Sequence, residues 1–131
     1  MAQSPALTVV EKAWDCWVAG DLDGMLGYFN PDAVLINSGR SRVSGEVRGH
    51  DAIRDWAHRV FEIAEGSFKA APTEMAEVNE TTVLVCFGAE AHRADASINQ
   101  IALQRVVLEG GKVSSVQNIY ADQYEVDAFF K

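Results

Sequence analysis

Glu90 and His92 are the residues whose types and spacing point most directly to acid–base chemistry. They lie two positions apart in residues 81–92, a stretch with the composition of a β-strand. Side chains two apart on a strand point to the same face of a sheet. Histidine exchanges protons near neutral pH, and burial makes a carboxyl group a usable acid or base. We therefore predict that this pair supplies proton transfer.

Asn118 and Tyr120 share a face of the last expected strand, residues 112–120, in the same way. Amide and phenol groups stabilise a developing enolate or a leaving hydroxyl by hydrogen bonding. On the strand over residues 81–92, the set expected to point inward is Leu84, Cys86, Gly88, Glu90 and His92. Cys86 has no evident activating base, so it is expected to be an inert pocket contact.

The acid–base hypothesis has a structural alternative for each member of the pair. His92 stands at a strand end beside the polar residues 93–95, where it would be solvated. Glu90 would pair with Arg105 across the sheet as a structural ion pair. Neither alternative involves chemistry.

Three helices and a set of strands must position these groups. Apolar residues recur at helical spacing over residues 5–19, Asp21 can cap a short second helix, and residues 49–65 carry a third apolar stripe. Asn30-Pro31-Asp32 is expected to break the chain before the first strand, and Pro72 indicates a sheet edge or a bulge. The expected strands span residues 33–37, 42–47, 68–78, 81–92, 97–108 and 112–120. Helices segregated from a largely antiparallel sheet indicate the α+β class.

A pocket is expected between these helices and the sheet, with aromatic groups on one wall and a few polar groups on the other. The residues expected to contact a ligand are Trp14, Trp17, Tyr28, Asn37, Trp56, Cys86, Gln100 and Gln104. The tryptophans are equally well explained as core residues, and Tyr28 as a core residue with its hydroxyl at the pocket. Asn37 precedes Ser38-Gly39 and could instead be a turn former. Exposed positions are expected for His50 and His58.

Three segments of the chain resemble a known family. They read WDCWVAGDLDGM with YFNPDAV over residues 14–34, GEVRGHDAI over residues 45–53, and GKVSSVQNIYAD over residues 111–122. This layout resembles SnoaL-like proteins of the nuclear transport factor 2-like superfamily, and the likeness spans nearly the whole chain. It implies a single domain over residues 1–131, a cone-shaped roll whose curved mixed or antiparallel sheet of about six strands wraps on three N-terminal helices.

The resemblance also implies pocket functions that can be tested residue by residue. A ketosteroid isomerase of this superfamily needs an aspartate where Asn37 stands, a tyrosine where Trp14 stands, and an aspartate near Leu103, so that mechanism is rejected. The related epoxide hydrolases need an arginine and two aspartates, where our alignment places Gly88, Glu90 and Asn118. Their water-holding asparagine matches Asn37. Only one of the three charged groups is retained, as Glu90, so epoxide hydrolysis by the family mechanism is not expected.

Composition restricts the partners. Eleven basic and nineteen acidic residues give a formal charge of −8, which argues against nucleic acid and against an anionic membrane surface. No stretch is apolar enough for a membrane span, no signal peptide is evident, and a cytoplasmic location is expected. The three histidines are far apart and no phosphate-binding glycine loop occurs, so no metal and no cofactor are expected.

Three functions remain. The first is a cofactor-free lyase, isomerase, dehydratase or cyclase acting on a hydrophobic oxygenated substrate. The second is a module that binds a hydrophobic small molecule without chemistry. The third is a protein-interaction domain, because Ile101, Leu103, Val107 and Ile119 would make the outer sheet face apolar. The resemblance implies a homodimer formed through that face, which is compatible with either pocket function.

Overall fold

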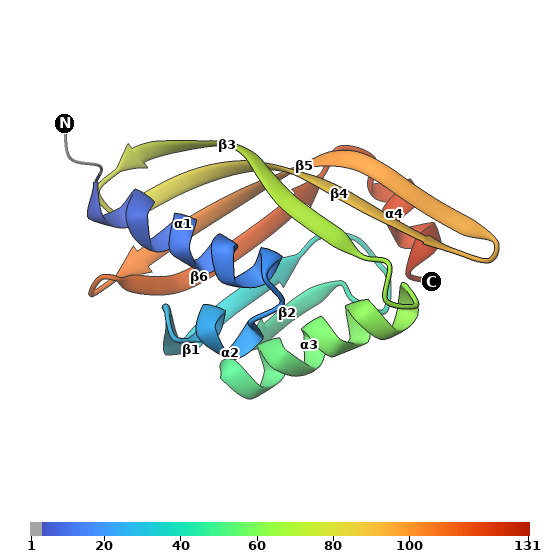
Figure 1. The fold of residues 1–131 in the computed structure, drawn as a ribbon, viewed down its shortest axis with the longest axis horizontal. Helices are drawn as coiled ribbons and strands as arrows, with labels where there is room; N and C mark the ends of the chain where they lie inside the picture. Colours follow the sequence, from blue (N-terminus) through green and yellow to red (C-terminus); the bar gives the residue numbers. More distant parts are fainter. Residues whose placement is uncertain (1–3) are drawn as a thin grey trace.

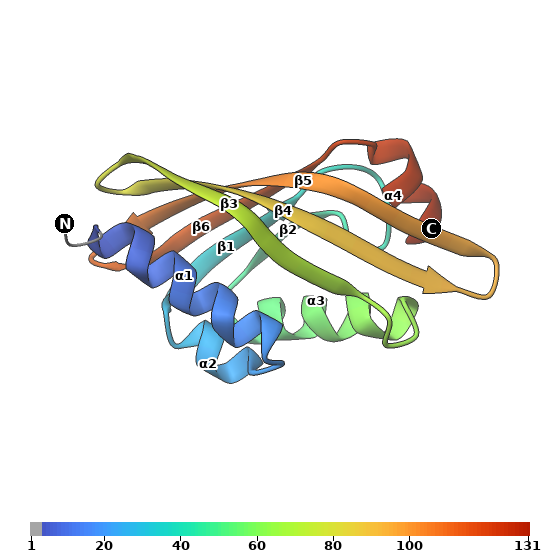
Figure 2. The same cartoon turned by 45° about the horizontal axis from the view of Figure 1, so that its top comes forward.

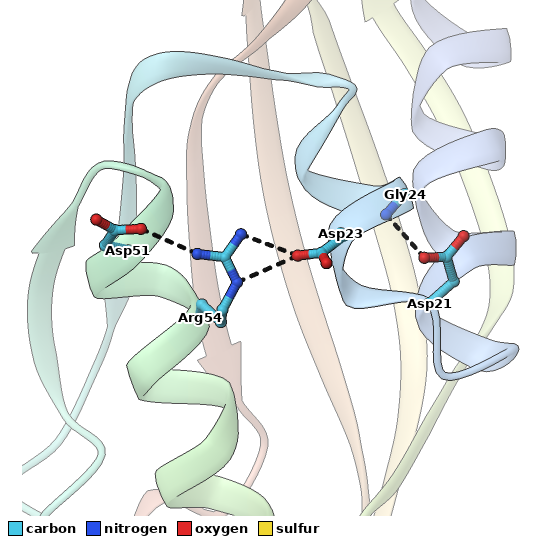
Figure 3. Close-up of polar contacts among 5 residues, drawn as sticks. All are labelled: Asp21, Asp23, Gly24, Asp51 and Arg54. Atoms are coloured by element: carbon cyan, nitrogen blue, oxygen red, sulfur yellow. Dashed lines mark hydrogen bonds and ion pairs between the residues drawn. The ribbon is translucent and has the colours of Figure 1, made fainter.

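The computed structural model describes residues 4–131, so the first three residues of the expected domain lie outside the described residues. Helix α1 (Pro5–Val18) begins at Ser4, whose hydroxyl oxygen accepts a hydrogen bond from the backbone N–H of Leu7 at 3.1 Å. Helix α2 (Leu22–Leu26) begins at Asp21 in the same way, with Gly24 as the donor (Figure 3). Helix α3 (His50–Ile63) buries its apolar stripe. These are the three helices predicted from the sequence.

The strands of the described chain form a six-stranded sheet in the order β2-β1-β6-β5-β4-β3. They are β1 (Phe29–Asn37), β2 (Gly45–Arg48), β3 (Lys69–Asn79), β4 (Thr82–Arg93), β5 (Ala96–Glu109) and β6 (Lys112–Tyr120). β1 runs parallel to β6 and the other neighbouring pairs are antiparallel, so the sheet is mixed. The predicted α+β class and strand number are confirmed.

The helices and the sheet form two layers. Figures 1 and 2 show α1, α2 and α3 on one side of a curved sheet, with the long strands β3 to β6 arching over them. The buried apolar residues lie between these layers. None of the helices within residues 4–131 has the length and apolar character that crossing a lipid bilayer requires.

Two local predictions about proline differ in outcome. Pro31 was expected to precede the first strand, but β1 already begins at Phe29, and the register with β6 shifts between Phe29 and Val34. An irregular stretch of strand tolerates proline because no regular ladder bond is lost there. Pro72 lies on the edge strand β3, where the register with β4 shifts between Pro72 and Glu74, as predicted.

A fourth helix, α4 (Gln123–Phe129), was not predicted. Asp122 caps it by accepting a hydrogen bond from the backbone N–H of Glu125 at 3.1 Å. Gln100 on β5 holds its start, because its amide oxygen accepts from Asp122 N at 2.9 Å. Phe129 and the following Phe130 are almost fully buried, so α4 closes one end of the space between the layers (Figure 1).

Arg54 on α3 links the helices at the surface. Its Nη2 lies 2.9 Å from Asp23 on α2, and its Nη1 lies 3.0 Å from Asp51 in the first turn of α3 (Figure 3). Both carboxylates are highly exposed, so water and salt screen these contacts. The bridge therefore orients α2 more than it stabilises the fold.

Candidate functional site

An interior cavity of about 80 Å³ lies between the sheet and the helices. The half-buried side chains among its lining residues, which include Trp17, Phe68 and Tyr120, form its border toward the surface. Its walls are apolar and aromatic except at Gln104 and Asn118 and at the Tyr120 hydroxyl. The full lining is Val10, Ala13, Trp14, Trp17, Met25, Phe29, Leu35, Ile53, Trp56, Ala57, Phe68, Phe87, Gln104, Val106, Val113, Val116, Asn118 and Tyr120.

A row of polar side chains crosses the inner face of three adjacent strands. Asn37 on β1 stands opposite Asn118 on β6, which stands opposite Gln104 on β5. Asn118 Nδ2 donates to Asn37 Oδ1 at 3.0 Å, and Gln104 Nε2 donates to Asn118 Oδ1 at 2.9 Å. At the other end, Trp14 Nε1 on α1 donates to Gln104 Oε1 at 3.0 Å. These four residues form a continuous chain of hydrogen bonds, which we call the amide row.

The direction of the amide row is set by Trp14. The orientation of a primary amide is normally inferred from its partners, since oxygen and nitrogen are hard to tell apart. An indole N–H donates and never accepts, so Gln104 must present its oxygen to Trp14. Gln104 then presents its nitrogen to Asn118, and Asn118 presents its nitrogen to Asn37. Every amide in the row points the same way.

The row ends in an unpaired donor. Asn37 is only 5% exposed, and within residues 4–131 its Nδ2 is a buried atom without a hydrogen-bond partner. Leaving a buried N–H unpaired costs about 1–3 kcal/mol. The turn role considered for Asn37 is wrong, because its side chain lies buried on the inner face.

Tyr120 stands on the same inner face of β6, two residues beyond Asn118. Its ring lies 6.4 Å from Phe87, and Phe87 lies 5.2 Å from Trp14, which fixes an aromatic wall beside the amide row. Burial raises the pKa of the Tyr120 phenol to about 12. The phenol therefore stays neutral and keeps its O–H as a hydrogen-bond donor at physiological pH.

The inward face predicted for β4 is wrong. Glu90 and His92 are exposed, and Cys86 lies on the same outer face with them. The buried residues that alternate with them along β4 are Val83, Val85, Phe87, Ala89 and Ala91. Glu90 and His92 therefore do not reach the cavity, and the proton transfer predicted for them has no structural basis.

The alternative ion pair between Glu90 and Arg105 is also wrong. Glu90 stands opposite Asn99, whereas Arg105 stands opposite Leu84, six residues away along β4. The solvated position considered for His92 is confirmed, because its side chain is exposed. Its backbone N–H, by contrast, is held by the hydroxyl of Ser67 at 2.8 Å.

The other predicted contacts divide into two groups. Trp14, Trp17, Trp56 and Gln104 line the cavity, and the face that Asn118 and Tyr120 share on β6 is the inner one. Trp56 donates to the carbonyl of Val43 at 2.9 Å, so its indole is not free for a ligand.

Tyr28, Asn37 and Gln100 are not among the lining residues. Tyr28 packs against the core, and Gln100 donates to the Asp122 carbonyl and to Glu125. His50, expected to be exposed, is partly buried, and its Nε2 lies 3.1 Å from the carbonyl oxygen of Phe29. His58 is exposed as expected.

Sequence reasoning missed the aromatic residues at the far end of the cavity. Phe68 lines the cavity and contacts Trp17 on α1 with ring centroids 6.4 Å apart. On its other side Phe68 lies 6.3 Å from Phe130, the residue that follows α4. A short polar-aromatic segment gave little signal that it would fold back, so this closure could be found only in the structure.

The cavity wall is electrically neutral. Among the lining residues of the described chain, Tyr120 is the sole group that can ionise, and none is a carboxylate, a histidine, a lysine or an arginine. A buried ion would have no opposite charge beside it. The site can bind apolar surface and exchange a few hydrogen bonds, and it lacks a side chain suited to accepting a proton at neutral pH.

Comparison with known proteins agrees with this architecture. The family model of the SnoaL-like domain matches residues 10–116. The uncharacterized protein Rv0034 of Mycobacterium tuberculosis is 22% identical over 130 residues, which is 99% of each chain. Bal32a from a soil-derived mobile gene cassette has a similar structure, with a TM-score of 0.91 and 21% identity over 97% of each chain.

A further similar structure is TerC co-crystallized with polyporic acid. Its TM-score is 0.85 at 18% identity, with 97% of this chain and 98% of that chain covered. At this identity the likeness concerns the fold. Together with the family model, which spans most of the sequence, it confirms the resemblance found in the sequence. The chain belongs to the SnoaL-like domain family, within the nuclear transport factor 2-like fold.

Proposed function

We propose that this protein binds a neutral, largely apolar small molecule that carries an oxygen acceptor. The observation that carries the proposal is a cavity with aromatic and aliphatic walls and a hydrogen-bonding cluster at Gln104, Asn118 and Tyr120. Small-molecule sites combine these features in this proportion. TerC, a protein of similar fold, was co-crystallized with polyporic acid, which supports a small-molecule ligand for this fold.

The charge of the ligand follows from the cavity wall. No cation lines the cavity within residues 4–131, and the whole chain carries a formal charge of −8. The same burial that raises the pKa of Tyr120 to about 12 would disfavour an anionic ligand. We therefore propose a neutral ligand, and a phenol or enol would bind in its protonated form.

The experiment is native mass spectrometry of the purified protein, followed by thermal shift with neutral aromatic ketones. A ligand bound at 100 times its Kd stabilises a fold by about 2.7 kcal/mol. Ala13→Leu fills the cavity and should abolish the shift, whereas Val18→Leu, on the exposed side of α1, should preserve it. A ligand-induced shift that survives Ala13→Leu would contradict binding at this site.

Catalysis is a second candidate, favoured by the neutral Tyr120 hydroxyl. A cofactor-free isomerase, lyase or cyclase needs donors aimed at the oxygen on which charge develops, and Tyr120 with Asn118 could serve as such donors. Loss of one such donor lowers kcat about 100-fold or more. Tyr120→Phe should cause that loss on an identified substrate. An unchanged turnover would reject this role for Tyr120.

We also propose that a second copy of the chain covers the outer face of the sheet. Leu84, Ile101, Leu103 and Ile119 are 44–61% exposed and lie together on β4, β5 and β6. Their centre lies between an Arg105 end and a Glu90 end, so a two-fold axis that runs across the strands at this centre would bring opposite charges together. Light scattering should give twice the 14.3 kDa chain mass, and Leu103→Glu should give a monomer. A monomeric wild type would overturn this proposal.

A cytoplasmic location stays a prediction.

A further inference from the structure

The amide row has a fixed direction, which leaves an unpaired hydrogen-bond donor at one of its ends. Gln104 and Asn118 are each used on both sides, as acceptor from one neighbour and as donor to the next. Asn37 accepts from Asn118, and nothing in the described chain accepts from its Nδ2. The unpaired group is therefore a donor at one defined end of the row.

The chemistry of that end depends on a residue at the opposite end. If the row pointed the other way, Asn37 would present its carbonyl oxygen and the site would suit a hydrogen-bond donor. The indole N–H of Trp14 forbids that arrangement, because Gln104 must offer it an oxygen. Trp14 is thus a positioning residue for an amide that lies three hydrogen bonds away.

We infer that the free amide N–H of Asn37 is the subsite for the acceptor oxygen of the ligand, and that Trp14 makes the pocket select acceptors over donors. This inference rests on the proposed binding function. Asn37 lies on the inner face of β1, directly opposite the cavity-lining Asn118. A carbonyl oxygen that reaches Nδ2 would pair the one donor that the row leaves buried and unpaired among the described residues.

The cavity of this structure is smaller than a ring compound needs. A cavity of about 80 Å³ is smaller than the ~150 Å³ that holds benzene in an engineered protein core. A ring compound must therefore displace half-buried side chains at the border, of which Tyr120 stands beside the row. We expect the same displacement to open the space next to Asn37, which is not among the residues that line the cavity in this structure.

The test compares two ligands of the same shape, acetophenone and ethylbenzene, by NMR titration of the full-length protein. Without a donor, an apolar cavity would bind ethylbenzene about tenfold more tightly, because the ketone carbonyl must lose its water. We expect acetophenone to bind at least as tightly as ethylbenzene. Its carbonyl stretching frequency should also fall on binding, because a hydrogen bond weakens the C=O bond.

Two variants at opposite ends of the row complete the test. Asn37→Ala removes the donor, and Trp14→Phe releases the orientation of the amides. Each should lower the affinity for acetophenone relative to that for ethylbenzene about tenfold. Trp17→Phe is the matched control, because Trp17 lies on the same helix and lines the same cavity outside the amide row. It should leave the ratio of the two affinities unchanged.

The outcomes separate the two proposals. If neither ligand binds the wild type, the proposed function fails and this inference fails with it. If ethylbenzene binds about tenfold more tightly than acetophenone, the pocket function stands and the acceptor subsite is wrong. Equal weakening of both ligands in Asn37→Ala and Trp14→Phe would also overturn the inference. If one variant does not fold, the other variant and the wild-type ratio still decide.

Discussion

The two faces of the same sheet carry different kinds of polar group. The inner face joins three amides into a row with Trp14: Asn37 and Asn118 are buried, and Gln104 is half-buried. The outer face carries the ionisable groups Glu90 and His92 in solvent, beside exposed apolar side chains. Neutral polar groups can be buried when they satisfy one another, whereas charged groups stay where water solvates them. The polar groups of the proposed ligand site are therefore amides and a phenol.

The largest expected difference between the faces concerns an aromatic side chain of the inner wall. Phe87 is 3% exposed and contacts both Trp14 and Tyr120, so Phe87→Ala should lower the free energy of unfolding by about 4 kcal/mol. Leu84→Ala, on the outer face of the same strand, should cost less than about 1 kcal/mol for the isolated chain. Urea denaturation at two protein concentrations measures both. Similar losses for the two variants would contradict the contrast between the faces.

A smaller effect is expected from breaking the amide row in its middle. Asn118→Leu leaves Gln104 Nε2 and Asn37 Oδ1 unpaired, so the free energy of unfolding should fall by about 3 kcal/mol. Gln117→Leu, at the neighbouring exposed position on β6, should change it by less than about 0.5 kcal/mol. Thermal or urea unfolding compares the pair. A harmless Asn118→Leu would mean that the row contributes nothing to stability.

The next prediction concerns alkaline pH. Tyr120 has a pKa of about 12 in the folded protein against 10.0 in the unfolded chain, so the unfolded chain loses its proton first as pH rises. Stability should therefore fall between about pH 10 and pH 12, and Tyr120→Phe should lack this part of the decline. Tyrosinate absorbance and unfolding curves across this range test it. An identical decline in Tyr120→Phe would show that the phenol is not buried.

The smallest effects are expected for the outer pair first suggested by the sequence. Glu90→Gln and His92→Ala should each leave ligand affinity in the cavity within about twofold, because both side chains are exposed on the face away from it. Calorimetric titration with whichever ligand shifts the melting temperature provides the measurement. A tenfold loss in either variant would require a route from the outer face to the cavity.

The sequence predicted most of the fold because its signals are local and agree with one another. Helical apolar spacing, the caps and the turn residues located three helices and every strand, and Pro72 was correctly assigned to an edge. Helix α4 was missed because it is short, although Asp122 followed three residues later by Glu125 is a usable N-terminal signal. Pro31 misled because an irregular part of β1 accommodates it.

The site residues were assigned correctly on two strands and wrongly on a third. Gln104 on β5 and Asn118 and Tyr120 on β6 line the cavity as assigned, although the alternation along β5 left its inward face ambiguous and the face of β6 followed from the family resemblance. On β4 both alternating sets begin apolar, with Val83 and Val85 on one face and Leu84 and Cys86 on the other. Alternation cannot choose between two apolar faces. The direction of the amide row was also beyond the sequence, since it depends on a contact between residues 14 and 104.

The irregular edge strand β3 has a consequence for aggregation. An exposed edge offers unpaired backbone groups to which another chain can add a strand. Pro72 lacks the N–H that such an added strand would need, and the register shifts beside it and near Asn79 interrupt the flat ladder. Lys69, Glu74 and Glu77 add charge along the same edge. Open-ended strand addition, which would build fibrils, is thereby disfavoured at this edge of the sheet.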